Sequence, residues 1–327
     1  MSGKILHTDR IEYIDVFRAL GIILMVMGHV GFGKSFDYFI HAFHMPMFFF
    51  ISGFVTKNRD IPFRDFLIKK SKSLLIPYFA FGILFIFVDL IWNKFDPVCV
   101  KNLFWISTNK LAIAEALWFL TALFFTDIIY FWINKFKDEN IKWIVVIFIT
   151  LIGCDFKSMF KFALPYAIGP AFVGVGLFHV GRCIKKYESF LTETIKIWHL
   201  LILLPILSYL IFKNGYINMR SELYANRSLF LILAIGFSVL GISMSNYIHK
   251  FLKNNLISKW LCEVGRDSIV YVCFNQFAIL LLNKYLPNIA IFSNLRNFWI
   301  LVFSFVIMYL INLILINTKL KFLIGRF

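Results

Sequence analysis

Long apolar segments, separated by short polar or basic ones, make up most of this 327-residue chain. A helix that crosses a bilayer needs about 20 mostly apolar residues. Candidate segments recur along the whole chain, and the fifth is the shortest: residues 14–32, 38–56, 73–92, 111–133, 141–154, 160–180, 195–212, 228–249, 267–286 and 297–316. The pattern predicts an all-α, polytopic bundle of about ten transmembrane helices. The connections are short, so we expect residues 1–327 to form a single membrane-embedded domain.

Composition supports a membrane protein and excludes two other classes. Apolar residues make up 60% of the chain and charged residues 16%, against roughly 45–50% and 25% in soluble domains. A water-soluble fold would expose large apolar patches. A disordered chain has few aromatic residues, whereas this one contains 41 Phe. We therefore expect a multi-pass protein of the cell membrane (inner or plasma), in contact with the lipid bilayer.

The net charge of +16 comes from basic residues in short clusters between the apolar segments. Such clusters flank membrane spans and do not form the continuous basic face that nucleic acid requires, so no nucleic-acid partner is expected. With loops assigned alternately to two sides, the side that holds both termini carries 20 Lys and Arg and the other side 9. The positive-inside rule therefore predicts cytoplasmic termini. Segment 57–72 contributes six of the 20.

Ionisable residues within a span are costly, so each is a candidate functional group. Arg18 and His29 are eleven residues apart in the first span, which places them on one helix face about 16 Å apart. Asp15 lies one turn before Arg18 on the same side. A purely structural role, in which Arg18 reaches the interface with Asp15 as its partner, explains Arg18 well. It explains His29 poorly, because His29 lies too deep.

Two further spans carry polar groups. His41 and His44 lie one turn apart in the second span, where Pro46 removes a backbone hydrogen bond and predicts a kink. Glu115 lies near one end of the fourth span. We expect these groups and those of the first span to form a polar cavity, although an interfacial or structural role stays open for each.

No familiar catalytic or metal-binding motif accompanies these groups. The five cysteines show neither a Cys-x-x-Cys nor a paired Cys/His spacing, so the sequence predicts no metal site and no disulfide framework. A Walker loop, a His-Glu-x-x-His and a Gly-x-Ser-x-Gly are likewise missing from it. From the residues alone, three classes remain open: an enzyme, a proton-coupled transporter or flippase, and a membrane sensor or scaffold.

The segments IEYIDVFRALGIILMVMGHV and FHMPMFFFISGF resemble the signatures of the acyltransferase-3 family of integral-membrane O-acyltransferases. The second resembles its fucose 4-O-acetylase-like branch in particular. The family is marked by an arginine, ten residues and a histidine, which Arg18 and His29 match. Weaker matches follow in the expected order and extend the resemblance to about residue 276. Ser73 stands where a basic residue usually precedes Leu-Leu-x-Pro, and Asn275 stands where a histidine is often found.

The resemblance implies transfer of an acyl group, usually acetyl, from cytoplasmic acyl-CoA to a hydroxyl group. The acceptor would be a sugar, a glycan or a lipid-linked molecule of the cell envelope, as in polysaccharide modification. No permanently bound cofactor is expected. His29 is the expected general base or transient acyl carrier, because a neutral imidazole accepts a proton near neutral pH. Glu115 or Asp15 would orient or balance it, and His44 is a candidate donor to the oxyanion.

The phosphates of acyl-CoA need cations, and the expected donor-binding set lies on the cytoplasmic side: Arg18, Arg64, Lys69, Lys70 and Lys72. Arginine binds phosphate through two parallel hydrogen bonds, whereas lysine acts as a point charge. The competing transporter or flippase would use the same polar residues as a proton-coupled substrate path. The sequence shows no inverted repeat, which favours the enzyme.

Overall fold

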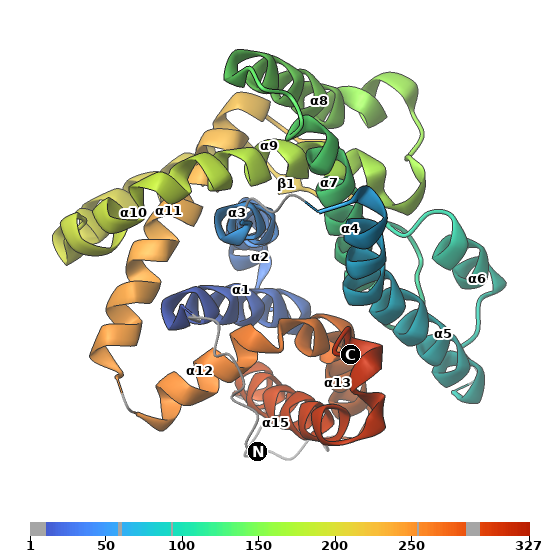
Figure 1. The fold of residues 1–327 in the computed structure, drawn as a ribbon. Coiled ribbons are helices and arrows are strands. Elements are labelled where there is room, and N and C mark those ends of the chain that lie inside the picture. The colour runs from blue at the N-terminus through green and yellow to red at the C-terminus, as the bar shows by residue number, and fades with distance from the viewer. Residues whose placement is uncertain (1–10, 58–60, 93, 254, 286–294) are drawn as a thin grey trace, which may run out of the picture.

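A computed structural model describes residues 11–57, 61–92, 94–253, 255–285 and 295–327 of the chain (Figure 1). Most of these residues are helical, as the apolar segments predict. The α-helices are α1 Glu12–Val30, α2 Lys34–His41, α3 Pro46–Val55, α4 Phe63–Lys70, α5 Ile76–Ile91, α6 Pro97–Phe104, α7 Trp118–Ile133, α8 Glu139–Phe160, α9 Ile168–Ile184, α10 Ile197–Asn214, α11 Arg227–Phe251, α12 Leu256–Arg266, α13 Ser268–Tyr285 and α15 Arg296–Asn317.

Short irregular helices and one small hairpin complete the described chain. They are the π-helical turns Ser71–Leu75 and Phe190–Thr194, the 3-10 turns Glu115–Leu117, Pro165–Ala167, Lys185–Tyr187 and Lys319–Ile324, and the strands β1 Ile217–Asn218 and β2 Leu223–Tyr224. The two strands pair antiparallel, with Ile217 opposite Tyr224. The predicted all-α class is confirmed.

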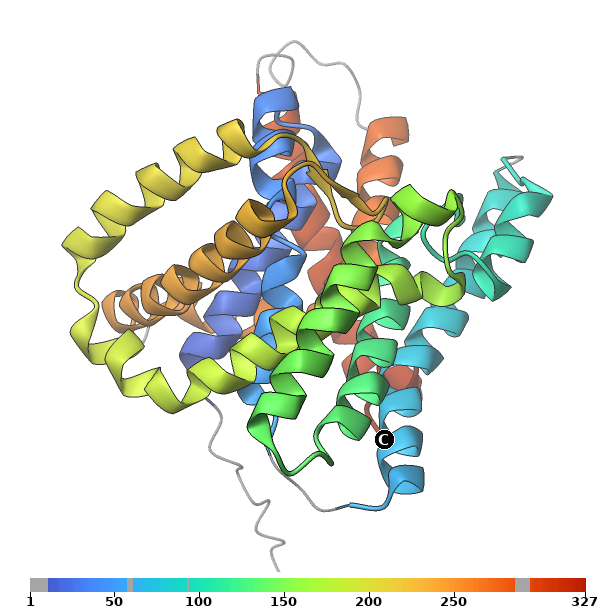
Figure 2. The same cartoon turned by 90° about the horizontal axis from the view of Figure 1, so that it is seen from above.

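Nine of the described helical segments are long and apolar enough to cross a membrane, or ten if the bent pair α12 and α13 counts as one span. This confirms the predicted bundle of about ten spans. Figure 2 shows the beginning of α1 and the C-terminal end on one side of the bundle and the β hairpin on the other. That the first of these sides faces the cytoplasm stays a prediction. Arg59, in the basic segment, and residue 286 lie outside the described residues.

Two spans depart from straight, regular helices. The second span consists of α2 and α3, joined by a turn at residues 42–45 that ends at Pro46, where the ring removes a helical hydrogen bond. The third runs from Phe63 through α4, a π-helical turn and α5 to Ile91. A π turn inserts one extra residue and changes which side chains share a face.

The fifth span is longer than predicted, because its polar end is fully helical. α8 continues to Phe160, beyond the predicted end at residue 154. Asp155 forms an ion pair with Arg227 at the start of α11. The Lys157 ammonium donates to a backbone carbonyl of the hairpin loop at 2.8 Å. These partners keep the charged turn of α8 on the protein and in place.

The helices α1 and α3 lie at the centre of the bundle (Figure 1). Each makes a very close backbone contact with a neighbouring helix. α1 packs against α11, α12 and α13, while α3 packs against α9. A Cβ on Gly53 of α3 would lie 1.9 Å from the Phe178 carbonyl oxygen, and one on Gly265 of α12 would lie 1.8 Å from that of Asp15. Glycine alone permits such approach. The two helices that carry the candidate site residues are thereby fixed by their neighbours.

Helices α8 and α10 lie at the periphery and carry an apolar outer face. Many of their exposed side chains are large and apolar, including Ile144 at 67%, Phe148 at 64% and Leu201 at 69%. In water such surfaces would drive aggregation, whereas lipid covers them at no such cost. The outer helices are therefore the lipid-facing ones, and the polar groups are left to the interior.

Candidate active site

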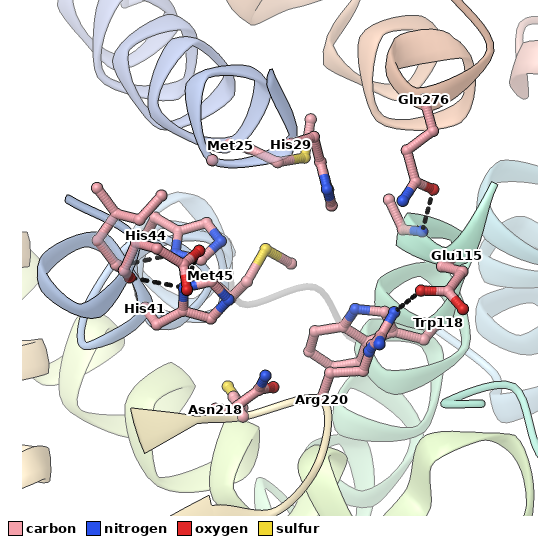
Figure 3. Close-up of a pocket in the computed structure, with 15 residues that line it drawn as sticks. Met25, His29, His41, His44, Met45, Glu115, Trp118, Asn218, Arg220 and Gln276 are labelled. Carbon is pink, nitrogen blue, oxygen red and sulfur yellow. Dashed lines mark hydrogen bonds and ion pairs between the residues drawn. The ribbon is translucent and has the colours of Figure 1, made fainter. Parts of the chain in front are cut away.

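A polar cavity of about 230 Å³, here named the histidine cavity, lies beside the last turns of α1 (Figure 3). Its wall comes from α1, the α2–α3 segment, the turn before α7, the β hairpin and α13. The lining residues are Met25, Gly28, His29, Asp37, Ile40, His41, His44, Met45, Glu115, Ala116, Trp118, Asn218, Met219, Arg220 and Gln276. Three of the predicted site residues, His29, His44 and Glu115, are thus brought together.

Three imidazoles face this cavity from two elements. Figure 3 shows His29 directed from α1 into the middle of the space, and its side chain is exposed there. His41 and His44 come from the end of α2 and the following turn, with ring centroids 5.2 Å apart. His44 is buried at 6% exposure. His29 is therefore the imidazole most accessible to a substrate.

Backbone carbonyls fix the tautomers of the other two rings. His44 Nδ1 lies 2.7 Å from the Ile40 carbonyl oxygen, and His41 Nδ1 lies 2.8 Å from that of Asp37. A carbonyl oxygen only accepts, so each Nδ1 carries the hydrogen and each Nε2 is the acceptor of a neutral ring. A neutral His44 can therefore take a proton at Nε2. It would donate to an oxyanion from that atom only as a cation.

The far wall of the histidine cavity holds an ion pair between Arg220 and Glu115 (Figure 3). Arg220 lies in the hairpin turn, and its side chain is 30% exposed while that of Glu115 is 36% exposed. Arg220 was missed by the sequence analysis, because a single arginine in an irregular loop carries no periodic signal. Its partner lies 105 residues earlier.

The hairpin that carries Arg220 contains a buried carboxyl group. Glu222 is 6% exposed and adopts a positive φ of 55°. A Cβ on Gly169 of α9 would lie 2.2 Å from its Oε2, so the glycine makes room for the carboxyl group. Burial raises the pKa of Glu222 to about 7, although the nearby Lys157 ammonium acts in the opposite direction.

The two amides of α13 have different partners. Asn275 donates to the carbonyls of Tyr271 and Val272, within its own helix. Gln276 accepts from the Ala116 backbone N–H at 3.3 Å. In Figure 3 the Gln276 amide nitrogen lies on the side of His29. Gln276 thus bonds to another element, whereas Asn275 bonds only along α13 in the described contacts.

Asp15 and Arg18 lie at the other end of α1, away from the histidine cavity. Asp15 is buried at 2% exposure, and its Oδ1 lies 3.5 Å from Arg18 Nη1. The structure therefore divides the predicted catalytic set into two groups. Asp15 is a partner of Arg18, whereas Glu115 shares a cavity with His29.

Arg18 lines a second cavity, of about 540 Å³, here named the basic cavity. It lies between α1, α3, α4, α7 and α9, and its lining residues are Arg18, Ser52, Val55, Thr56, Lys57, Ile61, Phe66, Lys69, Lys70, Asp127, Tyr130, Phe131, Asn134, Phe178 and Arg182. Lys70 Nζ lies 2.7 Å from Asp127 Oδ2. Three of the predicted donor-binding cations, Arg18, Lys69 and Lys70, meet here.

The other two predicted cations lie elsewhere. Arg64 is exposed and is not among the residues that line the basic cavity. Lys72 lies 4.7 Å from the centroid of the Phe327 ring and lines a separate apolar groove between α4, α5 and the C-terminal turn. In their place, Lys57 and Arg182 complete the basic cavity. Within the residues that the structure describes, no three His, Cys, Asp or Glu side chains form a group suited to a metal ion.

The fold and the two cavities define a class: a polytopic helical membrane protein with an imidazole-lined cavity and a phosphate-compatible cavity along one central helix. A family model described as an acyltransferase domain matches residues 11–317, and the chain belongs to the acyltransferase-3 family. The family predicted from the first two spans is therefore confirmed, and membership of it indicates a membrane acyltransferase. Searches of curated proteins and of solved structures returned no match.

Proposed function

We propose that this protein is an acyl-CoA-dependent O-acyltransferase of the cell membrane, with acetyl as the transferred group. The observation that carries the proposal is the placement of two different cavities along α1. Arg18 lines the basic cavity and His29 lines the histidine cavity, and eleven helical residues separate them by about 16 Å. A donor with phosphates at one end and a reactive thioester at the other fits this arrangement.

In this proposal the basic cavity holds the phosphates of the donor. Arg18 and Arg182 supply planar donors, and Lys57 and Lys69 supply point charges. The donor phosphates are multiply charged, so several cations are needed to bind them. These cations lie at the end of the bundle that is predicted to face the cytoplasm, where acyl-CoA is found. The pantetheine arm then extends along α1 toward His29.

A narrow place on α1 lies between the two cavities. Gly21 is on the stretch between Arg18 and His29, and a Cβ there would lie 2.7 Å from the Phe48 ring. Phe48 in turn packs on Phe119, with ring centroids 5.6 Å apart. Passage of the pantetheine arm therefore requires these aromatic side chains to change rotamer, whereas a larger residue at position 21 would close the path.

The chemistry proposed at His29 is general-base catalysis. His29 takes the proton of the acceptor hydroxyl, and the oxygen attacks the thioester carbonyl carbon. The carbon–sulfur bond then breaks and CoA leaves as a thiolate. The proton stays on the His29 imidazolium, which can then protonate the thiolate. The Arg220 guanidinium from the hairpin and the Gln276 amide from α13 also face this cavity (Figure 3), and they are suited to stabilise the oxyanion. Transfer of the acyl group first to His29 is the alternative route.

The acceptor proposed for the histidine cavity is a hydroxyl group of a sugar, a glycan or a lipid-linked envelope molecule. The fucose 4-O-acetylase-like motif at Phe43–Phe54 favours a sugar. The β hairpin, which lines the cavity, lies on the side of the bundle opposite the C-terminal end (Figure 2). An acceptor on the external face would thus reach His29 without crossing the bilayer, while the donor stays in the cytoplasm.

Two experiments test the proposed function. Purified protein incubated with labelled acetyl-CoA should release CoA and transfer the label to a sugar acceptor. A transporter or flippase would leave the acetyl-CoA intact. Sealed vesicles of known orientation then test sidedness, with donor and acceptor supplied on opposite faces. A requirement for both on the cytoplasmic face would reject transfer across the membrane but retain the acyltransferase.

A further inference from the structure

A third cavity opens beside the basic cavity, between α7, α8 and α9. Its volume is about 710 Å³, within the range of ligand-binding pockets. It shares Tyr130, Asn134 and Arg182 with the basic cavity, so the two cavities are adjacent. We name it the α8 cavity, because Glu139, Lys142 and Trp143 of the first turns of α8 form its outer wall.

The α8 cavity is strongly basic, although its residues were not part of the expected donor-binding set. Among the described residues that line it, Lys135, Lys142, Arg182 and Lys186 are cations and Glu139 is the one carboxylate. The Lys142 side chain is only 12% exposed, and its Nζ lies 2.5 Å from Glu139 Oε1. Since the Glu139 side chain is 67% exposed, water screens this carboxylate more than an enclosed anion would be screened.

Aromatic side chains accompany these charges. The Trp143 ring lies 4.3 Å from the His179 ring, centroid to centroid, and His179 Nδ1 is hydrogen-bonded to the Tyr130 hydroxyl at 2.8 Å. Arg182 lies over the Tyr130 ring at 5.7 Å. A cavity with cations beside flat rings suits a phosphorylated nucleoside, because a base stacks on such rings and a phosphate binds the cations.

We propose that the α8 cavity binds the 3′-phosphoadenosine part of the acyl-CoA donor, with Lys142 and Lys186 as the partners of the 3′-phosphate. This inference rests on the proposed function. Its geometry follows from the order of the elements. The thioester must point toward α1, and Figure 1 shows α8 on the far side of α9 from α1. The nucleoside end of the donor therefore falls at α8, and the diphosphate falls at the shared Arg182.

The closing experiment compares acetyl-CoA with acetyl-dephospho-CoA, which lacks only the 3′-phosphate, using the full chain in nanodiscs. We expect the wild-type KM to be about tenfold lower for acetyl-CoA, the scale of a charge-assisted hydrogen bond. Lys142→Gln and Lys186→Gln should each raise the KM for acetyl-CoA more than that for acetyl-dephospho-CoA, so that the ratio falls toward one. Lys101→Gln, an exposed lysine of α6 outside both cavities, is the matched control and should keep the wild-type ratio.

Binding of the two bare headgroups gives a second readout without turnover. Adenosine 3′-phosphate 5′-diphosphate should bind the wild type more tightly than ADP, which lacks only the 3′-phosphate, and both lysine variants should lose this difference. An equal KM for the two donors in the wild type would overturn the inference and leave the acyltransferase intact. No transfer from either donor would overturn the proposed function, and the inference with it.

An anionic phospholipid headgroup carries the same phosphate chemistry, so the nanodiscs are prepared with phosphatidylcholine alone and with added phosphatidylglycerol. The proposal expects the donor ratio to be the same in both lipids. If Lys142→Gln and Lys186→Gln change the response to phosphatidylglycerol but not the donor ratio, the cavity is a lipid site and the inference is rejected.

Discussion

The two cavities at the ends of α1 differ in how they carry charge. Among the described residues, the basic cavity is lined by five Lys or Arg side chains and one carboxylate. The histidine cavity has one arginine, two carboxylates and three histidines. The first therefore suits a polyanion held at long range, and the second suits a neutral hydroxyl group and proton transfer.

This difference separates binding from chemistry along a single helix. Arg18 and His29 belong to one stripe of α1, yet they line different cavities. Removal of a cation at one end should change donor affinity and its salt dependence. Removal of an imidazole at the other end should change turnover. A variant in one cavity that changed both donor affinity and turnover would show that the two cavities act as one functional unit.

The largest expected effect is that of His29→Ala. Loss of the general base should lower kcat by about 10² or more, while acetyl-CoA affinity stays near the wild-type value because the basic cavity is intact. Single-turnover transfer and binding of acetyl-CoA measure the two quantities separately. His199→Ala, on the peripheral helix α10, is the matched control. Near-normal turnover in His29→Ala would reject its assignment as the base.

The second prediction concerns the ion pair on the opposite wall. Arg220→Met and Glu115→Gln should each lower kcat/KM for the acceptor by about tenfold, since each leaves a partner charge facing the cavity. The double variant should lose less than the product of the two, which a double-mutant cycle measures. Arg227→Met, beside the same hairpin, removes a different ion pair and serves as the control. Full additivity would show that the pair does not act as a unit.

Helical periodicity explains which parts of the site the sequence predicts well. Arg18 and His29 share a face because eleven residues complete nearly three whole turns, and no tertiary information is needed. Arg220 comes from a hairpin turn and meets Glu115 across the fold, so no local pattern reveals it. Likewise, the ten apolar segments predict the spans, but the right-angle junction of α12 and α13 depends on tertiary contacts.

The predicted donor-binding cations do not all line one cavity, and for Lys72 the reason is structural. In a regular helix Lys69 and Lys72 would share a face, three residues apart. A π-helical turn at Ser71–Leu75 changes the phase, and Lys72 instead lies over the ring of Phe327. Insertions of this kind leave no signal in the composition, so spacing alone does not show which of the cations meet in one cavity.

The third prediction uses this division of the cations. Arg18→Gln and Lys69→Gln should each weaken acetyl-CoA binding about three- to tenfold, while Arg64→Gln and Lys72→Gln should not. The weakening should be greater at low ionic strength, where charges act over a longer range. Calorimetric titration at low and high salt measures both effects. An equal loss in all four variants would mean that the basic cavity has no special role in donor binding.

The smallest expected effect concerns the hairpin of the histidine cavity and its pH dependence. The folded-state pKa of Glu222 is raised to about 7 from an ordinary value of 4.5, so the fold binds more protons than the unfolded chain between these values. Stability should therefore fall as pH rises through this window and level off above pH 7. The shift corresponds to roughly 3 to 4 kcal/mol. Glu222→Gln, which stays neutral, should remove this part of the decline and raise the unfolding midpoint at pH 8 by a few degrees.

Unfolding midpoints at pH 5 and 8 measure this pH dependence, with Glu193→Gln, at an exposed position, as the control. Identical pH profiles for Glu222→Gln and the wild type would show that the buried carboxyl group does not destabilise the hairpin when it ionises.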